Sequence, residues 1–173
     1  GSDDVASGSD CLVQETAKLV GGGGDFFGTS VAVSGDAAII GASWDAQLGG
    51  RAGAAFVFRF DGSRWAQEAK LVASNGQAGE EAGGAVAIAG DWAFVGARYS
   101  NRVFVYHFDG VAWTQAGMLT PWDGMGDYFG SNLAAYGEWV VVGAMWQSND
   151  GKTNAGAAYV FHYNGSSWTE GQK

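Results

Sequence analysis

The side chains that could do chemistry recur at equivalent places along the chain instead of converging on one site. His107 and His162 occupy the same place in two related segments, and the first such segment has Arg59 there. A local metal motif needs ligands at close spacing, so a polar strand position is the better interpretation of both histidines. No arrangement typical of a Ser-His-Asp or Cys-His site is visible in the sequence. We therefore predict no catalytic residue and no enzymatic activity.

Carboxylates recur in the same way, each directly after a glycine: Asp25, Glu80 and Asp127. A catalytic pair would require two carboxylates that face one bond at a set separation. A carboxylate repeated in each unit fits a structural role better, because short acidic side chains accept backbone N–H groups in turns. We expect these residues to stabilise loops.

The elements that position these side chains belong to a repeat. Residues 24–42, 79–97 and 126–144 read GDFFGTSVAVSGDAAIIGA, GEEAGGAVAIAGDWAFVGA and GDYFGSNLAAYGEWVVVGA, and they align without a gap. Each copy contains two apolar runs separated by a glycine and an acidic residue. Such a pair suits a turn that needs glycine at its first central position. Each copy therefore predicts two antiparallel strands.

A second repeated tract follows each first one, and it contains two further apolar runs. The dipeptides between these runs are Asp61-Gly62, Asp109-Gly110 and Asn164-Gly165. They predict tight hairpins, because these residues accept positive φ. Each unit is thus predicted to form four antiparallel strands. No long segment has apolar residues at helical spacing.

These units resemble the FG-GAP repeat of the integrin α-chain propeller, in the version common in bacterial surface and secreted proteins. Phe27-Gly28 and Phe129-Gly130 match the first half of the motif, and Gly-Ala pairs at 41–42, 96–97 and 143–144 match the second. The middle copy departs from the motif with Ala82, and no copy has proline after Gly-Ala. The resemblance covers almost the whole chain. It implies a β-propeller and an extracellular, secreted or cell-surface location.

The spacing of the units, roughly 40 to 50 residues, is typical of propeller blades. We predict an all-β, propeller-like fold within residues 11–173, after a flexible tail at 1–10. The predicted four-stranded blades cover about 24–78, 79–125 and 126–173. Residues 11–22 resemble the outer strand of a blade, and we predict that they form an extra outer strand.

Three blades cannot close a ring alone, because closed propellers have about four to eight. Either the chain is a piece of a longer array, or two chains meet head to tail as a homodimer with six blades. Exposed strand edges favour self-association. The predicted assembly edge consists of residues near both ends: Val13, Thr16, Lys18, Trp168 and Glu170.

An aromatic residue stands two places after each Gly-Ala pair, as Trp44, Tyr99 and Trp146. In a propeller these residues fall on loops of one rim. Exposed aromatic side chains are good anchors for proteins or sugar rings, because they combine large contact area with few rotatable bonds. The alternative is that they pack between blades as part of the core. We take them as the candidate ligand-binding residues.

The family resemblance also implies a calcium site in the loop between the second and third strands of a blade. Only the loop of the third unit offers candidate ligands, which are Asn149, Asp150 and Asn154. Calcium prefers several carboxylate oxygens, and this loop supplies one carboxylate. We therefore predict no cofactor and keep calcium as an alternative.

The formal net charge of −9, with 9 scattered Lys and Arg residues, argues against nucleic acid and anionic membrane surfaces as partners. No apolar stretch is long enough to insert into a membrane. The first functional hypothesis is a non-enzymatic adhesion or recognition module that binds a protein or glycan through its rim loops, with a lectin as the sharper version. The second is a structural module that self-associates or completes a larger propeller.

Overall fold

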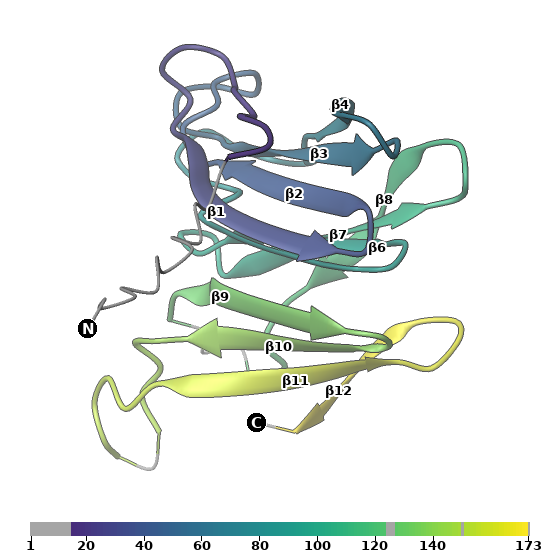
Figure 1. The fold of residues 1–173 in the computed structure, drawn as a ribbon. Helices are drawn as coiled ribbons and strands as arrows, with labels where there is room; N and C mark the ends of the chain where they lie inside the picture. The colour runs from purple at the N-terminus through teal and green to yellow at the C-terminus, as the bar shows by residue number, and fades with distance from the viewer. Residues whose placement is uncertain (1–14, 124–126, 150, 173) are drawn as a thin grey trace, which may run out of the picture.

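The computed structural model describes residues 15–123, 127–149 and 151–172, and these residues contain strands and turns but no helix (Figure 1). The strands are β1 (Phe27–Ser34), β2 (Ala37–Ala42), β3 (Ala54–Phe60), β4 (Trp65–Leu71), β5 (Ala85–Ala89), β6 (Trp92–Ala97), β7 (Arg102–Phe108), β8 (Trp113–Leu119), β9 (Phe129–Tyr136), β10 (Trp139–Ala144), β11 (Ala157–Tyr163) and β12 (Trp168–Gln172). They form three antiparallel sheets of four consecutive strands. The predicted all-β fold with three four-stranded blades is confirmed.

The turn between the first two strands of each blade follows the sequence prediction. Ser34 pairs with Ala37, so the turn consists of residues 35–36. Its first residue, Gly35, has a φ of 59°, and the equivalent Gly90 and Gly137 both have a φ of 55°. Glycine adopts this left-handed conformation without a steric penalty, which explains why it recurs there.

The hairpin between the third and fourth strands differs from the predicted tight turn. Phe60 pairs with Trp65, so residues 61–64 form a longer connection in which Gly62 has positive φ but Asp61 does not. Asp61 stabilises this connection with its side chain, whose Oδ1 accepts hydrogen bonds from the Ser63 hydroxyl at 2.7 Å and the Ser63 N–H at 2.9 Å. The Ser63 hydroxyl and nearby backbone N–H groups lower the pKa of Asp61 to about 2.

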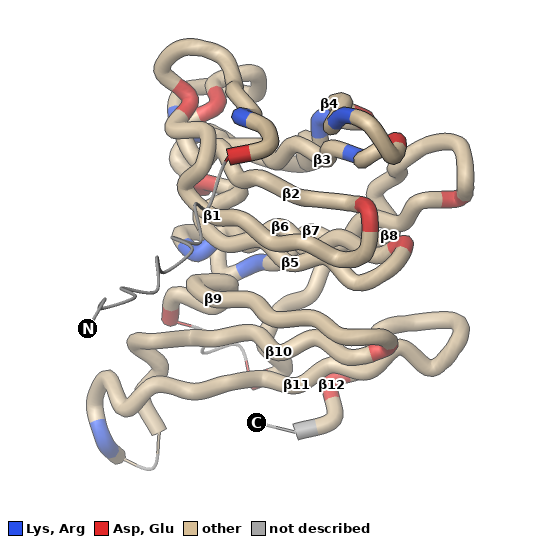
Figure 2. The backbone as a smooth tube through the Cα atoms, in the orientation of Figure 1, with Lys and Arg blue, Asp and Glu red and all other residues tan. Residues whose placement is uncertain are grey.

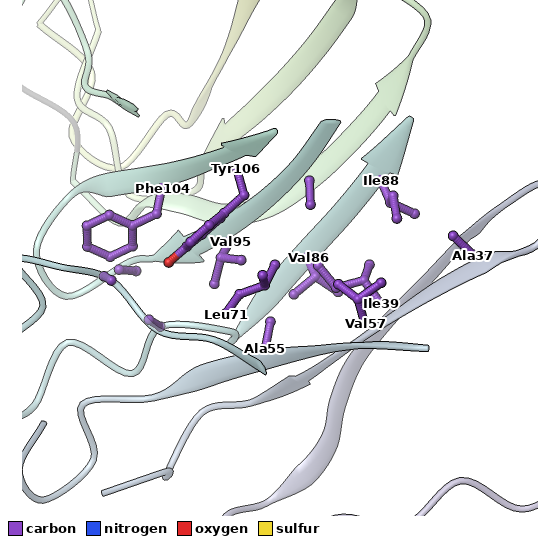
Figure 3. Close-up of a cluster of buried hydrophobic side chains, with 14 residues drawn as sticks. Ala37, Ile39, Ala55, Val57, Leu71, Val86, Ile88, Val95, Phe104 and Tyr106 are labelled. Carbon is purple, nitrogen blue, oxygen red and sulfur yellow. The ribbon is translucent and has the colours of Figure 1, made fainter. Parts of the chain in front are cut away.

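Each blade packs through two faces, here called the N-side face, toward the preceding blade, and the C-side face, toward the following blade. Between the first two blades, Ile39 and Val57 of the C-side face pack in one cluster with Val95 and Phe104 of the next N-side face (Figure 3). All four are at most 1% exposed. Burying such a side chain fully contributes about 1.5–3 kcal/mol. The blades are therefore held together mainly by apolar packing.

The same arrangement recurs between the second and third blades. Phe94 and Val105 of the second C-side face pack in one cluster with Phe129, Val142 and Tyr159 of the third N-side face. The Tyr159 and Phe129 rings lie 5.2 Å apart in an edge-on arrangement that aromatic pairs prefer. Residues at equivalent places of the repeat thus form equivalent junctions.

Glycines let the backbones of neighbouring blades approach closely at both junctions. A Cβ at Gly41 would overlap the carbonyl oxygen of Gly83 and lie 2.9 Å from its carbonyl carbon. A Cβ at Gly96 would overlap the carbonyl oxygen of Gly130 in the same way. The glycine of each Gly-Ala pair therefore meets the glycine at the Phe-Gly position of the next blade, which is Gly83 at the first junction and Gly130 at the second.

The three sheets do not close into a ring, so the first N-side face and the third C-side face are covered by no other blade of the described chain. Residues 15–22 form no strand, which differs from the predicted extra outer strand. The equivalent strands β4 and β8 each pair with the third strand of their own blade, and the described residues before β1 contain no third strand with which residues 15–22 could pair. Leu19 instead packs against the first N-side face. The predicted tail at 1–10 lies outside the described residues.

Charged residues lie mainly at the ends of the strands. Figure 2 shows the strands largely free of charge, with Asp and Glu gathered in turns and loops. This placement leaves the strand faces free for apolar packing. The described part of the chain contains no helix long and apolar enough to cross a bilayer.

Candidate functional site

The loops that follow β2, β6 and β10 carry the three aromatic residues singled out in the sequence. The strands β2 and β10 end on the same side of the molecule, where the long loops after them are visible (Figure 1). The side chains of Trp44, Tyr99 and Trp146 are 40%, 48% and 49% exposed. The N–H of Trp44 donates to the carbonyl of Asp25 at 3.1 Å, and that of Trp146 to the carbonyl of Asp127 at 3.4 Å. Each of these two loops is thereby tied to the segment before the first strand of its blade.

Phe26 and Tyr128 add a second layer of aromatic rings at this end of the molecule. Both have left-handed backbone conformations, with φ of 52° and 60°, which bulky residues rarely adopt. The Phe26 ring lies 4.2 Å from the Trp44 ring. The Tyr128 ring lies 4.4 Å from Trp146 and 5.4 Å from Tyr99, so it joins the loops of the second and third blades. Such backbone strain is concentrated at functional sites.

Glu81 occupies the equivalent place in the second blade, also with positive φ, and links the remaining aromatic residues. Its carboxylate is 4% exposed and binds Arg51 through Oε1 and Arg98 through Oε2, the latter at 3.3 Å. The Arg51 guanidinium lies 4.8 Å from the Trp44 ring centroid, and that of Arg98 lies 5.0 Å from the Tyr99 ring centroid. These are cation–π distances. One buried carboxylate thus fixes two guanidinium groups beside two aromatic rings.

The result is a continuous surface that runs over all three blades, which we call the rim strip. The rim strip consists of Phe26, Trp44, Arg51, Glu81, Arg98, Tyr99, Tyr128 and Trp146. It combines half-exposed aromatic rings with oriented guanidinium donors. Trp, Tyr and Arg are the residues that dominate binding energy at protein interfaces, and aromatic faces also stack on sugar rings. The strip contains no arrangement of an acid, a base and a nucleophile.

Three members of the rim strip, Trp44, Tyr99 and Trp146, were predicted from the sequence, and the other five were not. Phe26 and Tyr128 carried a recognisable signal, since both are aromatic and directly precede the Phe-Gly pair. Arg51, Glu81 and Arg98 carried none, because the ion pair between Arg51 and Glu81 joins different blades.

Two of the three calcium candidates make local contacts within their loop. Asn149 donates its side-chain amide to the carbonyl of Gly156 at 2.8 Å, and the Asn154 N–H donates to Ser148 Oγ at 3.3 Å. Asp150 lies outside the described residues. Elsewhere in residues 15–123, 127–149 and 151–172, no three His, Cys, Asp or Glu side chains gather in a way that could hold a metal ion.

The histidines and recurring carboxylates are held in separate local contacts. His107 lies 4.4 Å from the Trp92 ring and His162 lies 4.2 Å from the Trp139 ring. The Glu80 carboxylate accepts the Gln77 N–H at 3.0 Å, which is the kind of loop contact that we expected. The structure does not bring these groups together.

The predicted assembly edge divides into two regions. Thr16 and Lys18 line a groove of about 510 Å³ beside Trp65, on the side of the first blade. Trp168 lies between the second and third blades, 5.0 Å from the Phe94 ring, and Glu170 accepts the Trp122 N–H at 3.2 Å. Val13 lies outside the described residues.

Comparison with known proteins agrees with this architecture. The family model of the FG-GAP repeat matches residues 14–58, 65–106 and 113–161. A solved structure titled "Structure of YjhT" is similar to 83% of this chain at 15% sequence identity, with a TM-score of 0.48, and the match covers 44% of that structure's chain. No curated protein matches the chain. The family matches extend over most of the residues, and each covers the first two strands of a blade and most of the third. This protein therefore belongs to the FG-GAP repeat family and is a β-propeller module.

Proposed function

We propose that this protein is a non-enzymatic, extracellular or cell-surface recognition module that binds a protein or glycan through the rim strip. The FG-GAP family is generally non-catalytic and its repeats are typically extracellular, which supports this class. The observation that carries the proposal is the rim strip itself. Four of its five aromatic residues, Phe26, Trp44, Tyr99 and Trp146, are 40% to 58% exposed, although a β protein gains stability by burying such rings.

The rim strip is also held in a fixed arrangement before any ligand binds. Arg51 and Arg98 are oriented by the buried Glu81 carboxylate, and the Tyr128 ring packs on two loops. A binding surface that is already ordered loses little conformational entropy on association. This geometry supports recognition of a flat or elongated ligand along one rim.

The test is the simultaneous replacement of Trp44, Tyr99 and Trp146 by alanine. Wild-type protein and variant are applied to immobilised panels of oligosaccharides and of extracellular proteins. We expect the variant to lose retention on the ligand that the wild type binds, while keeping its melting temperature within about 5 °C, because these side chains are half-exposed.

The matched control is Trp122→Ala, which removes an exposed tryptophan outside the rim strip. This variant should retain binding. Collapse of the triple variant's melting temperature would instead assign the three residues to the core. Unchanged retention of the triple variant would refute the proposal.

A second function, self-assembly, is favoured by the two uncovered blade faces. Gly143 is equivalent to Gly41 and Gly96, and none of the three has a left-handed φ. A Cβ at Gly143 would meet nothing closer than Asn132 Cβ at 3.3 Å. At the two internal junctions, the backbone of the next blade packs directly against the equivalent glycine, Gly41 or Gly96. Gly28, at the other end, is equivalent to Gly83 and has open space around it. The two terminal faces thus keep the glycines that a further junction needs.

We propose that a second copy supplies this junction, with the third C-side face of one chain on the first N-side face of the other. Light scattering after size exclusion should give a mass of about twice 17.9 kDa. Gly143→Ala should reduce it to the monomer mass, whereas Gly117→Ala, whose Cβ would meet nothing within 4 Å, should not. A monomeric wild type at all concentrations would exclude this function without affecting the rim strip.

A further inference from the structure

The junction of the first two blades is closed on its outer side by a carboxylate. Glu68 on β4 accepts hydrogen bonds from Arg59 Nε at 2.6 Å and from Trp113 Nε1 at 2.8 Å. The Arg59 guanidinium lies 5.2 Å from the Phe108 ring centroid of the second blade. Glu68 therefore neutralises a cation and satisfies an indole donor across the junction.

The junction of the second and third blades has the same framework without that carboxylate. Ala116 stands at the place of Glu68, His107 at the place of Arg59, and Trp168 at the place of Trp113. Trp168 Nε1 is buried and has no hydrogen-bond partner among the described residues. A buried donor that is left unpaired is costly, so native structures seldom keep one without a reason.

A groove of about 410 Å³ lies where the carboxylate is missing. Its lining includes Trp92, His107, Thr114, Ala116, Tyr163 and Trp168. The aromatic part of the lining is continuous, since the Trp92 ring packs against both Tyr163, at 4.7 Å, and His107, at 4.4 Å. The groove lies near the hairpins that follow β7 and β11, at the end of the blades opposite to the rim strip (Figure 1).

We propose that this groove binds a sugar acid, with its carboxylate in the place that Glu68 occupies at the first junction. The carboxylate accepts hydrogen bonds from Trp168 Nε1 and from the His107 imidazole. The sugar ring stacks on the aromatic wall formed by Trp92 and Tyr163. Hydroxyl groups of the sugar bond to the side chains of Thr114, Ser166 and Ser167, which also line the groove.

A sugar fits the groove better than an acidic peptide, because the lining combines aromatic faces with three hydroxyl groups and lacks an arginine or lysine. The net charge of −9 opposes anions at long range, so short-range contacts carry the affinity. We therefore expect a dissociation constant on the order of 1 mM for a single sugar unit. Because Nε1 is buried, the Trp168 ring must turn slightly to reach the ligand.

The test follows the indole N–H resonance of Trp168 in ¹⁵N-labelled protein, assigned by its loss in Trp168→Phe. D-glucuronate should shift this resonance saturably, whereas D-glucose should not. A tripeptide with a central glutamate serves as the alternative source of a carboxylate and should bind at least about tenfold more weakly. Equal affinity for the tripeptide would overturn the assignment to a sugar.

Two variants separate filling of the groove from a change in charge. Ala116→Glu restores the side chain present at the first junction, and it should abolish the glucuronate shift. Ala112→Glu adds the same charge on the exposed hairpin and should leave the shift intact. The proposal fails if glucuronate gives no saturable shift up to about 50 mM, or if Ala116→Glu binds it as the wild type does.

Discussion

Replacing Gly96 by alanine tests the physical argument that blades are joined through close backbone approach. The new Cβ would lie 3.2 Å from the carbonyl carbon of Gly130 and would overlap the attached oxygen. Both partners are backbone atoms, so neither can rotate away. Restoring a carbon contact of about 3.5–4 Å requires a shift of about 0.3–0.8 Å, and relieving the overlap with the oxygen requires the third blade to move outward by roughly 1 Å.

The expected cost follows from that displacement. A gap of about 1 Å removes a quarter to a half of the dispersion attraction along a packed surface, and overpacking of this kind costs about 1–3 kcal/mol. Glycine-to-alanine substitution also lowers the conformational entropy of the unfolded chain, and this offsets about 0.4–1 kcal/mol of the loss in stability. We expect a net loss of about 2 kcal/mol for Gly96→Ala. This corresponds to a melting temperature lower by about 4–8 °C.

The assay is thermal and urea denaturation followed by tryptophan fluorescence, with Gly117→Ala as the control. Gly117 also lies in a strand without left-handed φ, and a Cβ there would meet nothing within 4 Å. The control should melt at or slightly above the wild-type temperature. Equal melting temperatures for Gly96→Ala and Gly117→Ala would refute the account of the blade junctions.

Three further predictions address single side chains. Asp61 has a pKa lowered to about 2, so its stabilisation is present above the unfolded value of 3.8 and is lost as the pH falls through 2. Asn164 makes the equivalent hydrogen bonds in the third blade, and its amide does not titrate. Asp61→Asn should therefore leave the free energy of unfolding at pH 7 nearly unchanged. In acid melting curves, the variant should lose less of this free energy between pH 5 and pH 2 than the wild type does. Glu81→Gln should cost about 1–3 kcal/mol in urea unfolding, because two guanidinium groups lose their carboxylate, and it should weaken rim-strip binding. Glu68→Ala should perturb the indole N–H resonance of Trp113, which loses its acceptor; an unchanged resonance would contradict the hydrogen bond.

The strands could be predicted because their signals are local. The Gly35-Asp36 turn depends on one backbone conformation that glycine adopts without strain, and the repeat shows the same signal three times. The position of the hairpin between the third and fourth strands was predicted correctly, but its length was not. The Asp61 carboxylate competes for the neighbouring N–H groups, and this gives a longer connection than a tight Asp-Gly turn.

The rim strip could be predicted only in part. Trp44 was visible as an aromatic residue at a fixed place in the repeat, but its partner Arg51 is oriented by Glu81, which belongs to the next blade. The calcium hypothesis came from family resemblance, and the structure adds that Asn149 in this loop donates its side-chain amide to the Gly156 carbonyl.

The sequence by itself determined the repeat unit, its four strands and the membership of a propeller family, since each depends on residues close together in the chain. Tertiary structure decided which side chains of different blades meet. Packing the C-side face of one blade on the N-side face of the next brings Glu81 to Arg51 and leaves Trp168 opposite Ala116. Such contacts join residues of neighbouring repeats, and their geometry is set by the backbone separation that Gly41 and Gly96 permit.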